Sequence, residues 1–448
     1  MLAATLIATS ARAQPAVPST RAIDAPDTAP LEPLAVFTSE LGGAGRLVVA
    51  PRDEALSLSV CVAPVRQRLD AALALAIAER GGEASRAAID GVDVLCGALP
   101  SSELPFAVWF ATHVVSAERA ARDGEPDDAD AETSGGAVDP SLVRAAAIAL
   151  EGATDETASL PARFVVTLAG RVERTAAEQL AAARFDVTRP REPASRPAPM
   201  KPQQTTERMS ALDADVASPF ARYAWVVPEG SDDEAAIRVA LEVLGGGEQA
   251  RLPRLFQGTH LGKRAEAWEL HVPGGTLSGL LIEPRARVSI DRIRRFVDGA
   301  LKQLRLVGPS RRELARAKQR LLLDAYRTWE DPVALARLLA SYELVRGGAE
   351  RARSAILALS RVTPRDVSRA VQRSLVDARR TTIEVYPPSF PADDPRVAAQ
   401  KLYTVVASDT LARIAERFHV SVAAIARAND LDPKYGLSEG QPLWIPVR

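Results

Sequence analysis

Residues 403–448 read YTVVASDTLARIAERFHVSVAAIARANDLDPKYGLSEGQPLWIPVR, and no other stretch of the chain has so clear a fold signal. The run 403–406 is rich in β-branched side chains, which favours a strand. Apolar residues then recur at helical spacing over 411–418 and again over 422–426. A closing strand is predicted over Pro442–Pro446, where proline is tolerated because both strands of a two-stranded sheet are edges. This order predicts a small βααβ module at 402–448.

Side chains that can cap helices mark the ends of both predicted helices. Ser408, Asp409 and Thr410 precede the first helix, and their oxygens can accept the free N–H groups of its first turn. Ser421 can cap the second helix, which ends at Asn429. The module therefore has its polar loops where the helices begin and end.

This pattern resembles the LysM family, a small carbohydrate-binding fold, at many spaced positions. Ser408 stands where the family usually has glycine, a mild departure that alters the loop before the first helix. The matching residues are Tyr403, Val405, Asp409, Thr410, Leu411, Ile414, Ala415, Val420, Ile425, Asn429, Leu431, Leu437, Gly440, Gln441, Ile445 and Pro446.

The resemblance implies a ligand. In the family, glycans that contain N-acetylglucosamine lie in a groove between the first strand–helix loop and the loop after the second helix. The corresponding residues here are Ser408, Asp409, Thr410 and Leu411 on one side and Asn429, Asp430 and Leu431 on the other. The alternative is that several of these residues are only caps and core, and that the module contacts protein instead.

The composition of the whole chain sets broader limits. A length of 448 residues predicts two or three domains, and 25% charged residues are ordinary for globular protein. The formal net charge of −1 gives no electrostatic reason to expect nucleic acid or an anionic membrane surface as a partner. No run reaches the roughly 18 apolar residues of a membrane helix, so no transmembrane segment is predicted.

The first residues predict export. Residues 1–13 contain a short apolar run and end in Ala11-Arg12-Ala13, a small-x-small pattern typical of signal-peptide cleavage. The start lacks the usual positive charge, and residues 14–32 have the composition of a flexible leader. Together with a glycan-binding module, this pattern predicts a periplasmic or extracellular protein associated with the cell wall.

The two cysteines leave two interpretations open. Cys61 and Cys96 both lie in runs with strand character. They are either two buried thiols in a sheet or, if their strands are neighbours in an oxidising compartment, a disulfide.

Breaks in composition divide the rest of the chain. An acidic, glycine-bearing segment at 122–139 predicts a disordered loop within a first domain, and a proline-rich segment at 189–217 predicts an interdomain linker. The predicted organisation is a first domain at 33–188, a second at 218–388, a linker at 389–401 and the terminal module.

Both domains show strands followed by covering helices, so we predict an α+β fold in which helices cover one face of an antiparallel sheet. In the first domain we expect strands at 45–50, 57–63, 92–98 and 164–170, and helices at 68–80, 103–118 and 175–185. In the second we expect strands at 222–227, 265–272, 277–282 and 380–386, and helices at 232–244, 289–306, 309–328, 332–346, 350–359 and 364–375.

Most of residues 36–388 resemble the insulinase/pitrilysin metallopeptidases, which include mitochondrial processing peptidase. The phrase FVVTLAGRVERTAAEQLAAARF at 164–185 is similar to the closing strand and helix of the family's first domain. The helices from 310 onward, with VTPRDV at 362–367, are similar to those of its second domain. The resemblance implies two α/β sandwich domains.

The zinc motif of that family is missing. Its chemistry needs His-x-x-Glu-His on a helix, because two histidines one turn apart bind Zn²⁺ and the glutamate activates water. The corresponding helix at 69–76 has no histidine. The chain's four histidines, His113, His260, His271 and His419, fit no zinc template, so no metal site and no cofactor are predicted.

The residues that hold substrate in the family's second domain are also missing. Ala250-Arg251-Leu252 keeps part of the phrase that precedes them, but 256–263 lacks tyrosine. We therefore interpret the chain as an exported, catalytically inactive insulinase-like protein that binds peptidoglycan or a related glycan. The alternative, implied by the resemblance, is a non-catalytic subunit of an active zinc peptidase of the same family. A metallopeptidase in its own right is the third reading.

Overall fold

The structure is a computed structural model. It describes residues 35–41, 45–65, 71–90, 92–124, 139–150, 164–185, 199–214, 216–286, 288–387, 400–406, 409–418, 420, 422–429, 437 and 441–446. The predicted signal peptide (1–13), leader (14–32), and most of the acidic segment and of the linker at 389–401 lie outside these ranges.

The first domain is built on a six-stranded sheet of order β1-β2-β6-β3-β5-β4. Most neighbours are antiparallel, but β2 and β6 are parallel, so the sheet is mixed rather than purely antiparallel. Its strands and covering helices are β1 (Phe37–Leu41), β2 (Gly45–Pro51), β3 (Ser57–Ala63), α1 (Ala71–Ala78), β4 (Glu83–Ile89), β5 (Val92–Pro100), α2 (Leu104–Gly124), β6 (Val165–Gly170) and α4 (Arg174–Arg184).

Helices α1, α2 and α4 cover one face of this sheet, as predicted. Alternate residues of β3 and β6, such as Val60 and Leu168, point into a core with Phe110 of α2 and Ala177 of α4. This alternation follows from the two-residue period of a strand.

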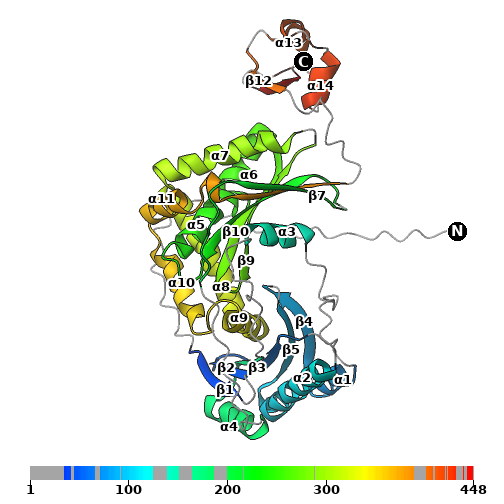
Figure 1. Cartoon of the computed structure of the whole chain (residues 1–448), viewed down its shortest axis with the longest axis vertical. Helices are drawn as coiled ribbons and strands as arrows, with labels where there is room; N and C mark the ends of the chain where they lie inside the picture. The colour runs from blue at the N-terminus through cyan, green and yellow to red at the C-terminus, as the bar shows by residue number, and fades with distance from the viewer. Residues whose placement is uncertain are drawn as a thin grey trace, which may run out of the picture. The chain divides into compact units, whose positions relative to one another are not determined.

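The opposite face of the first sheet is covered by a helix from much later in the chain. Helix α9 (Pro332–Leu344) packs against β3 and β6. The approach is close at Gly170, where an added Cβ would lie 3.2 Å from the Pro332 side chain and 2.2 Å from the Ser57 carbonyl oxygen. Leu335 and Leu339 of α9 are fully buried. Figure 1 shows α9 lying over β2 and β3.

The second domain is built on a five-stranded sheet of order β7-β11-β8-β10-β9, in which β7 and β11 are parallel. The predicted linker at 189–217 is therefore too long, because Arg208–Asp213 form β7 at the edge of this sheet. The elements are β7 (Arg208–Asp213), β8 (Phe220–Pro228), α5 (Glu234–Gly245), α6 (Arg251–Thr259), β9 (Gly262–Val272), β10 (Gly275–Pro284), α7 (Ile290–Val307), α8 (Arg311–Glu330), α10 (Arg351–Arg361), α11 (Pro364–Arg373) and β11 (Thr381–Tyr386).

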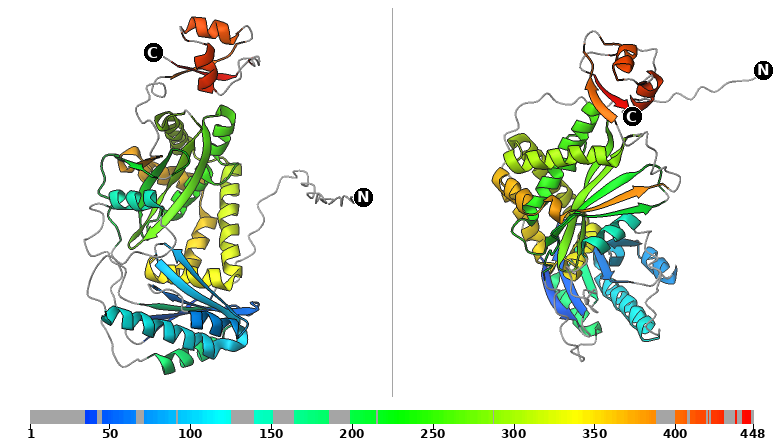
Figure 2. Two further views of the ribbon diagram at one scale, coloured as in Figure 1. Left: turned by 90° about the vertical axis from the view of Figure 1, so that its right-hand side faces the viewer. Right: turned by 45° about the horizontal axis from the view of Figure 1, so that its top comes forward.

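One face of the second sheet packs against α5, α7 and α11, and the other is covered by α3 (Pro140–Ala149). Ala145 and Ala149 of α3 lie in one buried cluster with Leu277 and Ile383. In Figures 1 and 2, α3 is the cyan helix beside the green strands. Because α3 precedes β6 in sequence, each domain supplies one helix to the sheet of the other.

An ion pair fixes the start of α3 on the second sheet. Asp139 caps the helix by accepting the Ser141 N–H at 2.9 Å. Arg222 of β8 pairs with the Asp139 carboxylate, and its Nε donates to the Ser141 hydroxyl at 2.6 Å. These contacts join residues more than 80 positions apart, which no local sequence pattern could predict.

The terminal module has the predicted order of β12 (Gln400–Thr404), α13 (Leu411–Arg417), α14 (Val422–Asn429) and β13 (Pro442–Pro446). The strands are antiparallel, with Leu402 opposite Trp444. The first strand starts earlier than its predicted position because Gln400 pairs with the last residue of β13. Buried side chains from α13, α14, β13 and the residue that follows β12 share one core: Val405, Leu411, Ile414, Ala415, Ile425, Leu443 and Ile445.

In the described part of the chain, every helix is too short or too polar to cross a membrane.

Candidate functional site

The loop between β12 and α13 is organised around the carboxylate of Asp409. Its Oδ2 accepts the Tyr403 hydroxyl at 2.6 Å and the Val406 N–H at 2.9 Å. The Tyr403 hydrogen bond, followed by that of Val406, lowers the pKa of Asp409, and the same contact raises the pKa of Tyr403. Asp409 is therefore ionised at neutral pH and holds the loop against the first strand.

The next two residues of this loop serve the helix and the core. The Thr410 hydroxyl accepts the Arg413 N–H at 3.2 Å, which caps α13. Leu411 is buried in the core of the module. Thr410 itself is exposed, so its hydroxyl lies at the surface of the loop.

The second side of the predicted groove begins at Asn429, the last residue of α14. Its side-chain amide donates to the Ile425 carbonyl at 2.7 Å, a bond that ends the helix. Its side chain is only partly buried. The other predicted groove residues, Ser408, Asp430 and Leu431, lie outside the described residues.

An aromatic and cationic group beside this loop was not among the predicted site residues. The rings of Tyr403 and Phe418 meet edge to face, with centroids 5.4 Å apart. The Arg417 guanidinium lies 5.5 Å from the Tyr403 ring centroid and donates to the Tyr403 hydroxyl at 3.2 Å. The signal was present in the sequence, since Arg417 lies one helical turn beyond Arg413 on the exposed face of α13.

The histidines of the two larger domains lie apart from one another. His113 stacks on Trp109 at the surface of α2 with ring centroids 5.3 Å apart. His260 ends α6 with a left-handed backbone, φ 53°. His271 Nδ1 lies 3.1 Å from Asp90 Oδ1, and His419 lies outside the described residues.

Helix α1 overlaps residues 69–76, where the family resemblance predicts the zinc motif. Its sequence, AALALAIA, contains no metal-binding side chain. It contributes Leu73 and Ile77 to the core instead. Within the described ranges, no three or more His, Cys, Asp or Glu side chains are grouped to hold a metal ion.

Acidic groups near His271 are bound to arginines. Glu269 pairs with Arg238 at 3.1 Å, and Glu229 pairs with Arg351. A polar pocket of about 380 Å³ between α5, α10 and β9 includes these groups. Fixed cations therefore neutralise the carboxylates of Glu229 and Glu269.

The retained phrase Ala250-Arg251-Leu252 has a structural role in the second domain. Arg251 makes two hydrogen bonds to the Glu313 carboxylate, at 2.7 and 3.0 Å, and a third to the Gly308 carbonyl at 3.0 Å. The Arg251 bonds lower the pKa of Glu313 to about 2. This fork links the start of α6 to the start of α8.

The cysteines are joined. Cys61 and Cys96 are directly opposite each other on β3 and β5, and they form a disulfide with Cα atoms 4.1 Å apart. The sequence left open two buried thiols or a disulfide, and the structure shows the disulfide.

Comparison with known proteins supports both family resemblances. The LysM domain family model matches residues 403–446, so the terminal module is a LysM domain. Comparison with curated protein sequences gave no match.

The two preceding domains have the fold of M16-like peptidases. One similar structure is a protease from Helicobacter pylori, with 14% identity and a TM-score of 0.60, covering 79% of this chain and 99% of that one. Another is an inactive peptidase M16 domain from Pseudomonas fluorescens, with 14% identity, a TM-score of 0.55 and coverage of 79% and 98%. A putative M16-like peptidase from Alicyclobacillus acidocaldarius also matches at 14% identity, with a TM-score of 0.52 and coverage of 79% and 99%. The predicted α+β architecture with two insulinase-like domains and a LysM domain is thus confirmed.

Proposed function

We propose that this chain is a wall-binding protein that attaches to peptidoglycan through its LysM domain. The observation that carries the proposal is the match of residues 403–446 to the LysM family, since LysM domains bind glycan. The predicted groove residues Asp409, Thr410 and Asn429 lie at the polar ends of α13 and α14, where hydroxyl and amide groups can bond to sugar hydroxyls and acetamido groups.

We propose that Tyr403, Phe418 and Arg417 support the residues of this groove. Tyr403 and Arg417 hold the carboxylate of Asp409 and the ring of Phe418 in one cluster. A carboxylate that is already held in place loses less conformational entropy when a glycan binds.

The proposed compartment is the periplasm or the cell exterior. The Cys61–Cys96 disulfide supports this proposal, because disulfides persist in oxidising compartments and are rare in the cytosol. The signal-peptide pattern at 1–13 is a second, independent indication.

We propose that the protein does not cleave peptides. The helix that carries zinc ligands in active relatives has the sequence AALALAIA, and its inward side chains Leu73 and Ile77 pack in a hydrocarbon core. That an inactive M16 domain shares this fold shows that the fold does not itself imply catalysis.

Pelleting with insoluble peptidoglycan tests the proposal. The full chain should pellet much more than residues 1–390, which lack the LysM domain. A variant with Asp409→Ala should pellet less than one with Glu416→Ala, because Glu416 is exposed on α13 outside the loop. Equal pelleting of the full chain and the truncated form would contradict the proposal.

The second candidate function is a non-catalytic subunit of an active zinc peptidase. The observation that favours it is that the domains keep a complete M16-like fold, since the match covers 99% of the Helicobacter protein. Affinity purification of this chain from its native cells tests the idea. It predicts a stoichiometric partner of the same fold that carries His-x-x-Glu-His, and it fails if the chain elutes alone at its own mass.

A further inference from the structure

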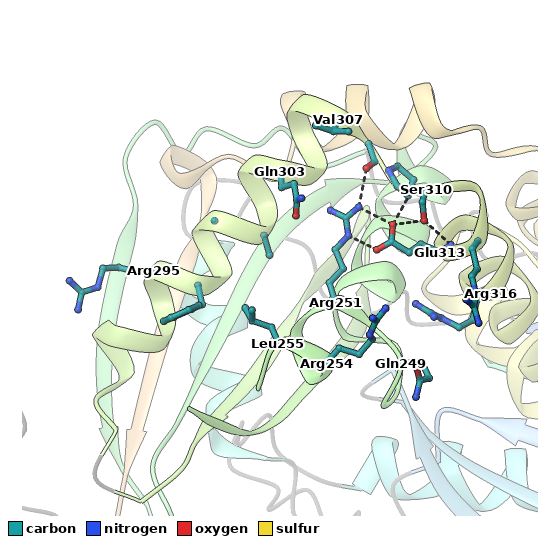
Figure 3. Close-up of a pocket in the computed structure, with 16 residues that line it drawn as sticks. Gln249, Arg251, Arg254, Leu255, Arg295, Gln303, Val307, Ser310, Glu313 and Arg316 are labelled. Carbon is teal, nitrogen blue, oxygen red and sulfur yellow. Dashed lines mark hydrogen bonds and ion pairs between the residues drawn. The ribbon is translucent and has the colours of Figure 1, made fainter. Parts of the chain in front are cut away.

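A large cleft lies in the second domain between α6, α7 and the start of α8. Its volume is about 1140 Å³, which is above the usual range for a small-molecule site and far too large for a single ion. Figure 3 shows the side chains that line it. Four of the cationic ones come from all three helices: Arg254, Arg295, Arg312 and Arg316.

A fifth arginine of the cleft is already neutralised. Arg251 is bound to Glu313 by two hydrogen bonds and to the Gly308 carbonyl by a third. Both side chains are less than one-fifth exposed, so this pair forms the fixed floor of the cleft.

The other four arginines have no carboxylate within ion-pair distance among the described residues. Glu242, which also acts on Arg316 from a distance, is paired with Arg320 at 2.9 Å. Figure 3 shows Arg254 of α6 facing Arg316 of α8. Burial is the main cause that lowers the pKa of Arg316; Glu313 raises this pKa, and repulsion from Arg254 and Arg312 lowers it by smaller amounts. An anion between these groups would relieve that repulsion.

The apolar part of the lining helps to identify the anion. Leu255, Phe296 and Val307 lie among the arginines, and Val307 is 78% exposed. Phe296 is the single aromatic side chain of the cleft and is partly buried, so successive nucleic-acid bases would not find the series of aromatic platforms on which single strands stack. Alternating cationic and apolar groups fit a peptide with several carboxylates, because guanidinium groups bind carboxylates in a two-pronged fork.

We infer that this cleft is a second binding site, specific for a peptide with closely spaced carboxylates, and that its ligand is the stem peptide of peptidoglycan. The assignment of the stem peptide as the ligand of the cleft rests on the proposed function of the LysM domain. Stem peptides carry free carboxylates and are attached to the glycan that a LysM domain binds. One polymer would then occupy both sites, and each bound site would raise the effective concentration of ligand at the other.

Amidase digestion of peptidoglycan gives the two ligands separately, as peptide-free glycan strands and as soluble stem peptides. Binding of fluorescently labelled stem peptides to the full chain should be measured by anisotropy at low and high salt. The test variant is Arg254→Gln with Arg316→Gln. The matched control is Arg327→Gln with Arg353→Gln, two exposed arginines outside the cleft that give the same change in net charge.

We expect the test variant to bind stem peptides at least about tenfold more weakly than the control, since charge-assisted bonds from both arginines are removed. Binding to the unaltered protein should also weaken as salt is raised. Peptide-free glycan strands should bind both variants equally through the LysM domain. An unchanged midpoint of urea unfolding checks that the second domain of the test variant is folded, because glycan binding reports on the LysM domain alone.

Three results would overturn the inference. The first is that stem peptides do not bind the unaltered protein, whatever the glycan strands do. The second is that both variants bind stem peptides equally. The third is that a single-stranded oligonucleotide of matched charge competes as well as the peptide, which would make the cleft a general polyanion surface. Failure of the glycan strands alone to bind would count against the proposed function and not against the cleft.

Discussion

The carboxylate of Asp90, in the turn between β4 and β5, accepts two hydrogen bonds from the guanidinium of Arg346, which lies 256 residues further along the chain. The distances to Oδ2 are 2.9 Å from Nε and 2.6 Å from Nη2. Ser341 of α9 donates to the same oxygen, and both members of the ion pair are nearly buried. Burial by itself would raise the pKa of Asp90, but the His271 hydrogen bond and the Arg346 charge outweigh it and hold that pKa well below its usual value.

Replacing Asp90 with asparagine should lower the free energy of unfolding by about 3 kcal/mol, because the change leaves a buried guanidinium without its counter-charge. Asparagine tolerates the left-handed backbone at this position, φ 50°, so the effect would not come from strain. Urea unfolding measures it. The control is Asp324→Asn, which removes an exposed pair at 3.8 Å and should cost well under about 1 kcal/mol. Equal losses in both variants would contradict the prediction.

The Arg251–Glu313 pair should make stability depend on acid pH. The hydrogen bonds from Arg251 hold the pKa of Glu313 at about 2, below its ordinary value of 4.5. Because the folded-state pKa is the lower one, this contribution is present above about pH 4.5 and is lost as pH falls toward 2. Unfolding free energies at pH 7, 4 and 2.5 should therefore fall more steeply for the unaltered chain than for Glu313→Gln. Parallel pH profiles would show that the pair contributes nothing.

The disulfide should stabilise the first domain. Cys61 and Cys96 close a loop with a sequence separation of 35, for which loop-closure entropy predicts about 3–4 kcal/mol. Adding a reductant should lower the thermal midpoint of the unaltered protein. The reductant should not change the thermal midpoint of a Cys61→Ala, Cys96→Ala variant. This variant should already melt at the lower temperature. A midpoint insensitive to reductant in the unaltered protein, with the bridge shown to be reduced, is the contrary result.

Tyr403→Phe should separate loop order from core packing in the LysM domain. The change removes the 2.6 Å hydrogen bond to Asp409 but keeps the ring against Phe418. We expect a loss of about 1 kcal/mol in domain stability and several-fold weaker pelleting with peptidoglycan. Titration of glycan fragments followed by tryptophan fluorescence measures the affinity directly. Unchanged affinity with lowered stability would assign Tyr403 to the fold alone.

The LysM domain could be predicted from sequence in almost complete form because its signals are local. Caps, helical spacing and a β-branched start all lie within about 45 residues. The strand β12 began at Gln400 rather than 403 because pairing with Pro446, and not propensity, sets that end. The aromatic cluster around Tyr403 was missed because it needs the contact between β12 and α13.

The elements missed in the larger domains have weak local signals. Strand β4, with the sequence EASRAAI, has few β-branched residues and takes its conformation from pairing with β5. Helix α6 keeps apolar residues at helical spacing, Leu252, Leu255 and Phe256, but Pro253 within it argues against a helix on local grounds. The Cys61–Cys96 contact depended on the β3–β5 register, which only the assembled sheet defines.

Because α3 packs on the second sheet and α9 on the first, the chain cannot be divided into two independent halves. A cut between 186 and 198 leaves the first sheet without α9 and the second without α3, so each fragment would expose a bare apolar sheet face. Neither half is then a self-sufficient folding unit, and separate expression should give insoluble protein. Co-expression of the two fragments should instead yield a soluble non-covalent pair, which makes this fold suited to a split reporter.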